Sequence, residues 1–147
     1  MVTTLTVLKS IHVLAAALWI GGALLLNVAV TLAMRADGPE ARITTLRLTR
    51  FSILWVFAPL AAIVFITGIW LTEEYYDPSD LWISLGMTGW LIAVIVMLAV
   101  IWPRAGRMLA ALEGGDPPLS PKLAVYSARF NLVLLSAVLV IMVIRPT

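Results

Sequence analysis

The sequence contains no cysteine and only one histidine, His12. Without cysteine the chain has no disulfide, no thiolate metal site and no cysteine nucleophile. One histidine offers little for a Ser-His-Asp arrangement, and no glycine-rich phosphate-binding loop is present. Carboxylates occur in pairs only in the loops between apolar segments. These absences argue against hydrolytic and phosphoryl-transfer chemistry.

Charged residues are also scarce. They make up 12% of the chain, whereas 62% of it is hydrophobic and the mean hydropathy is +1.04. A soluble domain is about 45–50% apolar, so a chain of this size must have lipid as its main solvent. The basic residues lie in short loops, and no basic face carries interleaved aromatic residues, which argues against a nucleic-acid partner.

Long apolar runs are what the sequence does contain. Four of them reach the roughly 20 residues that a membrane-spanning helix needs, and they predict helices at about 5–34, 51–72, 81–103 and 121–144. The first run is too long for the apolar region of a signal peptide, so we expect it to be a retained helix. The predicted fold is an all-α bundle of four transmembrane helices in one membrane domain.

Polar joints separate these runs. Residues 40–50 are expected to form a helical lead into the second span, and residues 102–103, Trp-Pro, mark the predicted end of the third. The glycines and prolines of 114–118 are expected to break any helix. Pro59, followed by Thr-Gly at 67–68, predicts a kink and a close helix contact in the second span.

The distribution of Lys and Arg predicts the orientation. The joints at 35–50 and 104–122 together hold seven of these residues, whereas the other side of the membrane holds only Lys9 and Arg145. The joint at 73–80 on that other side is acidic, and we interpret it as a solvated loop rather than a metal site. We therefore expect both termini outside the cell and His12 near the outer end of the first helix.

His12 is the leading candidate for chemistry. An ionisable residue within a membrane helix suggests function, and imidazole is a common axial ligand of haem iron. Small residues beside it on one helical face would leave a groove for a flat ligand or for another helix. That face comprises His12, Ala15, Ala16, Trp19, Gly22, Ala23 and Leu26.

Two interpretations of this face stay open. In one, His12 binds haem, and a second iron ligand would come from another chain or from a methionine, of which Met142 is a better candidate than Met87 or Met97. In the other, His12 hydrogen-bonds water or a neighbour, and the small residues only permit close helix packing. Arg129, within the fourth run, is expected to extend its guanidinium toward lipid phosphates.

The segment at 8–27, LKSIHVLAAALWIGGALLLN, resembles the first helix of the CopD-like group of small bacterial membrane proteins. The group includes the copper-resistance CopD domain, the HemJ-type protoporphyrinogen oxidases and a set of four-helix proteins of unknown function, to which the match is closest. Further agreement comes from Pro59 with 66–68, from 102–103 and from the ending at 142–146. The resemblance thus extends over most of the chain.

The resemblance implies specific roles. HemJ-type enzymes are taken to bind b-type haem and to use a first-helix histidine with a lysine in a later helix. His12 matches that histidine, but residues 81–103 contain no lysine, which argues against porphyrinogen oxidase activity. CopD proteins are associated with copper uptake, for which one histidine and scattered methionines are a thin ligand set.

The sequence therefore favours a multi-pass protein of the bacterial cytoplasmic membrane that binds b-type haem through His12 and has an electron-transfer or haem-linked redox role. Trp19 and Gly22 would line the site, and Lys9 and Arg145 would meet the haem propionates. We also expect contacts with further copies or with a larger membrane complex. The alternatives are a cofactor-free accessory subunit of a respiratory or photosynthetic complex and, with less support, copper handling.

Overall fold

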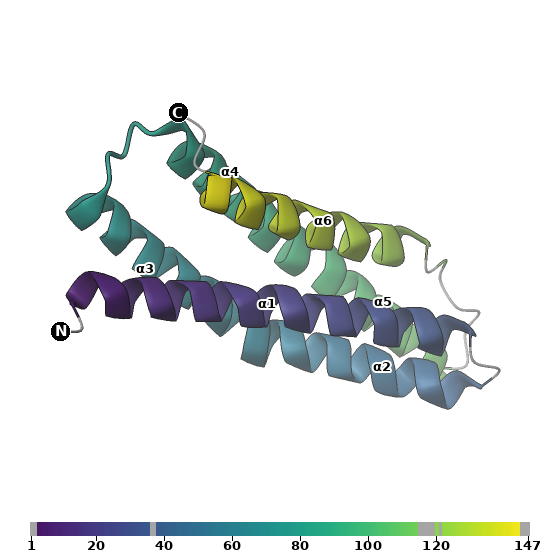
Figure 1. Ribbon diagram of the computed structural model, residues 1–147. Coiled ribbons are helices and arrows are strands. Elements are labelled where there is room, and N and C mark those ends of the chain that lie inside the picture. Colours follow the sequence, from purple (N-terminus) through teal and green to yellow (C-terminus); the bar gives the residue numbers. More distant parts are fainter. Residues whose placement is uncertain (1–2, 36–37, 115–119, 121, 145–147) are drawn as a thin grey trace.

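The computed structural model describes residues 3–35, 38–114, 120 and 122–144. All regular structure in these residues is helical, and four continuous helical stretches are long and apolar enough to cross a membrane. Figure 1 shows that α1 begins and α6 ends at the same end of the bundle. The prediction of an all-α, four-helix transmembrane bundle is confirmed.

The first and fourth spans are single helices, whereas the second and third each consist of two α-helices joined by a short π-helical turn. In chain order the elements are α1 (Thr4–Arg35), α2 (Pro39–Ser52), η1 (Ile53–Phe57), α3 (Ala58–Tyr75), α4 (Leu81–Ile95), η2 (Val96–Ile101), α5 (Trp102–Gly114) and α6 (Lys122–Ile144).

Each π-helical turn is followed by a proline. Pro59 is the second residue of α3, and Pro103 is the second residue of α5. A proline inside an α-helix removes one hydrogen bond and its ring clashes with the carbonyl four residues earlier. The wider π-helical turn accommodates both effects, because local π geometry re-satisfies the backbone groups that a proline frees. Each span thus continues through its proline.

This continuity corrects one prediction. The third span does not end at residues 102–103, since α5 runs on to Gly114. Its apolar face packs on α2, where Leu46, Ala105, Met108 and Leu109 form a buried cluster. The burial of these side chains stabilises the extension, and Pro103 costs little at the start of a helix. The predicted helical lead at 40–50 corresponds to α2.

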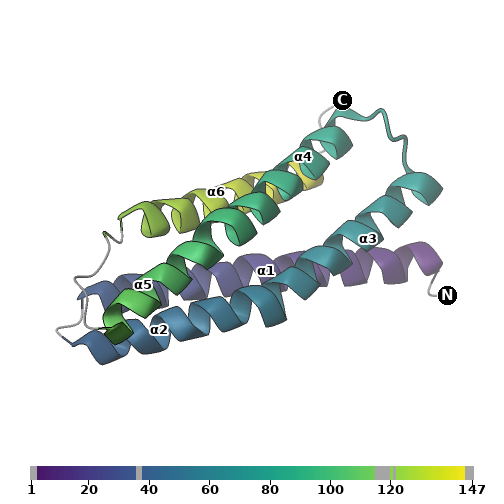
Figure 2. The ribbon, with the colours of Figure 1, turned by 180° about the vertical axis from the view of Figure 1, so that it is seen from behind.

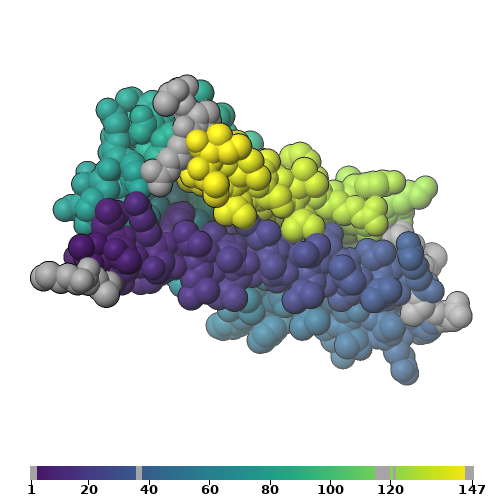
Figure 3. All heavy atoms as spheres, in the orientation of Figure 1, coloured from purple at the N-terminus to yellow at the C-terminus, as the bar shows by residue number. Residues whose placement is uncertain are grey.

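The main core lies in the middle of the bundle. It contains Trp19, which is only 1% exposed, together with residues from η1, α3, α4, η2 and α6. Large apolar side chains on the outer surface, such as Leu25 (72%) and Val143 (73%), are in contrast largely exposed. Such a surface is expected where lipid replaces water as the solvent. Figure 3 shows α1 and α6 side by side across one face of the molecule.

The bundle has one tight end and one open end. At the tight end α2 packs on α5, and the Arg47 guanidinium bonds the Glu113 carboxylate between them. At the other end α1 stays with α3 and α4 stays with α6, while the two pairs diverge (Figures 1 and 2). The divergence leaves room between the pairs, and this is where His12 lies.

Candidate functional site

A cavity of about 660 Å³ lies between the α1–α3 pair and the α4–α6 pair. Its size falls within the range of roughly 300–1,000 Å³ that is usual for ligand pockets, and its mostly apolar lining with few polar groups is also typical of them. We call it the histidine cleft. Its walls include His12, Ala16, Trp19, Phe65, Gly68, Gly86, Met87, Trp90 and Met142.

The imidazole of His12 is held by α3. Its Nδ1 lies 2.9 Å from Oγ1 of Thr67. The Thr67 hydroxyl has one proton, which it donates to the carbonyl of Ile63 at 2.6 Å. The hydroxyl oxygen must therefore accept from His12, so the proton of the neutral imidazole is on Nδ1. His12 also hydrogen-bonds the backbone of Val64. In this tautomer Nε2 has no proton to donate, so its lone pair remains.

This arrangement is typical of a histidine that ligates a metal. Ligating histidines usually donate their second ring N–H to an oxygen of the protein, which fixes the tautomer and the orientation of the ring. Here Thr67 has that role, and its own bond to the α3 backbone keeps the hydroxyl in place. Nε2 of His12 is thus prepared to bind an electrophile or to accept a hydrogen bond.

Two glycines make space at opposite walls of the cleft. A Cβ atom on Gly68 would lie 3.2 Å from Cε1 of His12, so even alanine would crowd the imidazole. A Cβ atom on Gly86 of α4 would overlap the methyl group of Met142, which lies against this glycine. The absence of side chains at these positions lets His12 and Met142 occupy facing walls of one cavity.

Two stacked aromatic rings form part of the cleft wall between α3 and α4. Phe65 and Trp90 are stacked, with ring centroids 4.5 Å apart and an interplanar angle of 19°. The indole N–H of Trp90 donates to the carbonyl of Ala61 at 3.1 Å, which fixes the ring. The pair gives this part of the cleft an aromatic lining without unsatisfied polar atoms, and aromatic rings pack well against a planar, apolar ligand.

The predicted site residues are only partly together. His12, Trp19 and Met142 line the histidine cleft. Lys9 is not among the residues that line it, and its Nζ lies 5.4 Å from the centre of the Tyr76 ring. Gly22 packs against Phe57 and is not among the residues that line the cleft, so the structure favours helix packing for this glycine. Arg145 lies outside the described residues.

The other residues that the sequence singled out lie in different parts of the molecule. Met87 lines the cleft beside Trp90, whereas Met97 is 2% exposed in the core and does not line it. Arg129 is exposed on α6, an arrangement compatible with its expected extension toward lipid phosphates. In the predicted acidic loop, hydrogen bonds from the backbone and side chain of Ser79 lower the pKa of the exposed Asp77 carboxyl.

The predicted face of α1 is divided rather than continuous. Trp19 lines the histidine cleft together with His12 and Ala16, and it also lines a second, smaller cavity together with Ala23 and Leu26. Ala15 and Gly22, which belong to the same predicted face, line neither cavity. The helical periodicity gave no sign that a buried indole would split this face. Trp19 thus separates two cavities in the same bundle.

Sequence reasoning did not assign the hydrogen-bonding role of Thr67, the glycine at 86 or the Phe65–Trp90 wall. A signal was available for one of them. A polar residue next to glycine in a membrane helix, as in Thr67-Gly68, often contacts a polar group on another helix. The spacing of Gly86 and Trp90 carries no comparable signal, because their roles depend on which helices face each other.

Among the described residues, no group of three or more His, Asp or Glu side chains is arranged to hold a metal ion.

A family model matches residues 6–146, and its description reads "Predicted integral membrane protein (DUF2269)". No curated protein matches the chain, and neither does any solved structure.

Proposed function

The chain belongs to the family of integral membrane proteins described as DUF2269, and we propose that it binds b-type haem in the histidine cleft through Nε2 of His12. The observation that carries this proposal is the His12–Thr67 bond, which favours a neutral imidazole with its proton on Nδ1 and with Nε2 unprotonated. A structural role alone does not require this tautomer, whereas an iron ligand does.

The residues present fit a porphyrin in three respects. The cleft has a volume of about 660 Å³ and a wall that includes the stacked rings of Phe65 and Trp90. Gly68 and Gly86 let the candidate ligands His12 and Met142 lie directly against α3 and α4, and both side chains line the same cavity. A porphyrin supplies four of the iron's ligands itself, so the protein needs to provide only one or two.

Each residue then has a defined task. His12 would hold the iron, and Thr67 would keep its ring in one orientation and one tautomer. Met142 would be the candidate for a second iron ligand, and Met87 and Trp19 would exclude water from the apolar part of the cleft. Lys9 is the candidate to neutralise a propionate, together with Arg145. When bound, haem b supplies one-electron redox chemistry.

We further propose an electron-transfer or haem-linked redox role in the bacterial cytoplasmic membrane. The resemblance to the CopD-like group supports this reading, because its implied haem ligand coincides with His12. Porphyrinogen oxidase activity is not proposed, since the lysine that the resemblance requires is missing from 81–103. The family description names no activity, so the proposal depends on the cleft and on the resemblance.

The test is an absorbance spectrum of the purified full chain, before and after addition of haemin. We expect a Soret band at a stoichiometry near one haem per chain and its loss in His12→Ala. Ser10→Ala is the matched control, because Ser10 lies on the same helix and bonds only its own backbone at Thr6. This control should retain the spectrum.

A folded wild-type protein that stays colourless and does not take up added haemin would contradict the proposal. It would instead favour the cofactor-free accessory subunit that the sequence also allows. Retention of the full Soret band by His12→Ala would show that the haem is held elsewhere. Circular dichroism of each variant would confirm that the helices are intact.

A further inference from the structure

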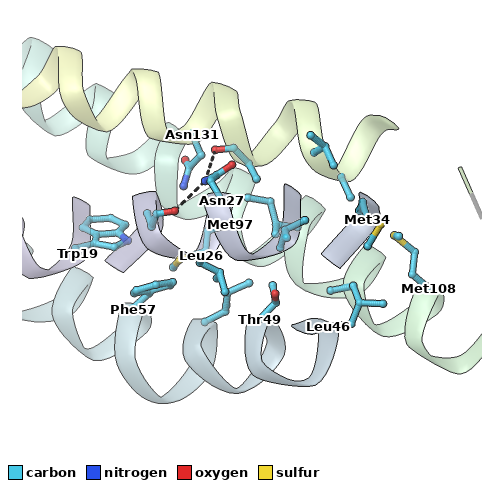
Figure 4. Close-up of a pocket in the computed structure, with 18 residues that line it drawn as sticks. Trp19, Leu26, Asn27, Met34, Leu46, Thr49, Phe57, Met97, Met108 and Asn131 are labelled. Carbon is cyan, nitrogen blue, oxygen red and sulfur yellow. Dashed lines mark hydrogen bonds between the residues drawn. The ribbon is translucent and has the colours of Figure 1, made fainter. Parts of the chain in front are cut away.

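A second cavity lies on the other side of Trp19 from the histidine cleft. Its volume is about 60 Å³, and it extends from Trp19 toward Met108 at the tight end of the bundle (Figure 4). Its lining is mostly apolar, and its polar side chains are those of Asn27, Asn131 and, farther from Trp19, Thr49 of α2 (Figure 4). We call it the asparagine pocket.

Two polar atoms in this pocket lack a partner. Oδ1 of Asn131 and Nε1 of Trp19 are buried and make no hydrogen bond within the described residues. Both residues are at least nine-tenths buried, with 5% and 1% of their surface exposed. Figure 4 shows the nitrogen of the Trp19 ring on the side that faces the two asparagines.

Asn27 differs from Asn131 because the protein itself satisfies it. Its Nδ2 donates to the carbonyl of Ala23 at 2.9 Å and to that of Ala128 at 3.4 Å. Thr49 is likewise satisfied by the carbonyl of Thr45. Among the fully buried side-chain atoms of these lining residues, the unmet demand is one acceptor on Asn131 and one donor on Trp19. Such groups are costly in a membrane interior, where neither lipid tails nor bulk water can bond them.

We propose that the asparagine pocket is a water-binding site, in which ordered water accepts a hydrogen bond from Trp19 Nε1 and donates one to Asn131 Oδ1. A buried water needs about 10–15 Å³ of accessible volume and two to four polar partners. The pocket has space for about four such molecules by that measure. Its polar end supplies the partners, whereas its apolar end does not.

Other ligands fit less well. A monovalent cation would satisfy the carbonyl oxygen of Asn131 but would be repelled by the N–H of Trp19. An organic ligand needs a pocket of roughly 300 Å³ or more, which is several times the volume available. Water both donates and accepts, so it meets the demand of both residues, and it would do so even with the amide of Asn131 turned over.

The experiment is water-edited solid-state NMR of the full chain in lipid bilayers, with ¹⁵N-labelled tryptophan. The Trp19 indole signal is assigned by its loss in Trp19→Phe. We expect it to receive magnetisation from water faster than the indole of Trp55, which is 71% exposed on the lipid-facing surface. Asn131→Leu removes the acceptor and fills the polar end. In this variant, transfer from water to the Trp19 indole should be no faster than transfer to the Trp55 indole.

Ser136→Ala serves as the control on α6, because Ser136 is exposed and bonds only the Leu132 carbonyl of its own helix. It should leave the transfer to Trp19 unchanged. Slow transfer to Trp19 in the wild-type protein would overturn the proposal, whether or not Asn131→Leu folds. Fast transfer that persists in folded Asn131→Leu would overturn it as well, since the water would then come from the histidine cleft. The result does not depend on haem binding.

Discussion

His12 and Thr67 are 55 positions apart in the chain, yet their bond defines the chemistry of the candidate site. Thr67 belongs to α3, and its hydroxyl proton is committed to the Ile63 carbonyl. The direction of one hydrogen bond therefore determines the direction of the next. The result is an imidazole whose Nε2 has its lone pair free, without any charged residue contributing to the arrangement.

Thr67→Val tests this dependence directly. Valine has nearly the same shape but no acceptor, so the Nδ1 proton of His12 would lose its partner and the preference for one tautomer would weaken. Loss of such a supporting interaction typically reduces metal-site affinity about 10- to 100-fold. We expect haem affinity to fall by that amount in a haemin titration, while the Soret band remains detectable at saturation.

Thr72→Val is a suitable control for this titration. Thr72 lies on the same helix and bonds the Gly68 carbonyl rather than another helix. Its substitution should leave haemin affinity unchanged. Equal affinities of the wild-type protein and Thr67→Val would mean that the hydroxyl does not orient the iron ligand.

The adjacent glycines at 21 and 22 look equivalent in the sequence but differ in their packing. A Cβ atom on Gly22 would lie 2.7 Å from Cε1 of Phe57, whereas one on Gly21 would meet nothing within 4 Å. Gly22 thus allows the close approach of α1 to η1, and Gly21 does not face a neighbour. Only one of the two is needed for the bundle.

Gly22→Ala should therefore destabilise the protein, and Gly21→Ala should not. Overpacking of this kind costs about 1–3 kcal/mol, which should lower the thermal unfolding midpoint measured by circular dichroism in detergent. Because Gly22 packs on Phe57 rather than on the cleft, the haem content of the folded fraction should stay the same. An unchanged midpoint in Gly22→Ala would show that Phe57 can rotate away freely.

The four spans were predictable because an uncharged apolar run of membrane length is typical of a transmembrane helix and rare in other folds. The course of those spans was not predictable. The path of the third span through Pro103 depends on the π-helical turn of η2 and on the packing of α5 against α2. Neither is visible in local sequence, because proline and the glycines of 114–118 are ordinary signals for a helix end.

The candidate site likewise has parts that the sequence predicts and parts that it does not. His12 was recognisable as the one imidazole in an apolar helix, and Met142 as a sulfur atom at a similar predicted depth. Their common cavity exists because α1–α3 and α4–α6 diverge, which is a property of helix pairing. Gly22 was assigned to the same groove because periodicity shows which residues share a face, but not what packs on each part of it.

The two ends of the whole molecule differ in charge. α2 and α5 carry arginines at the tight end, whereas the Tyr76–Asp80 connection and the end of α3 at the open end are acidic. Lys and Arg favour the cytoplasmic side of a membrane. The histidine cleft would then face the extracytoplasmic half of the bilayer, and the redox partner that the proposed function requires would reach it from that side.

Cysteine labelling tests this orientation, because the chain has no cysteine of its own. Ser79→Cys places a thiol at an exposed position of the acidic connection, and Thr44→Cys places one at an exposed position of α2. In intact cells a membrane-impermeant maleimide should label Ser79→Cys, whereas Thr44→Cys should react only after the membrane is opened. The reverse pattern would place the histidine cleft in the cytoplasmic half, and the electron donor or acceptor would then have to be a cytoplasmic one.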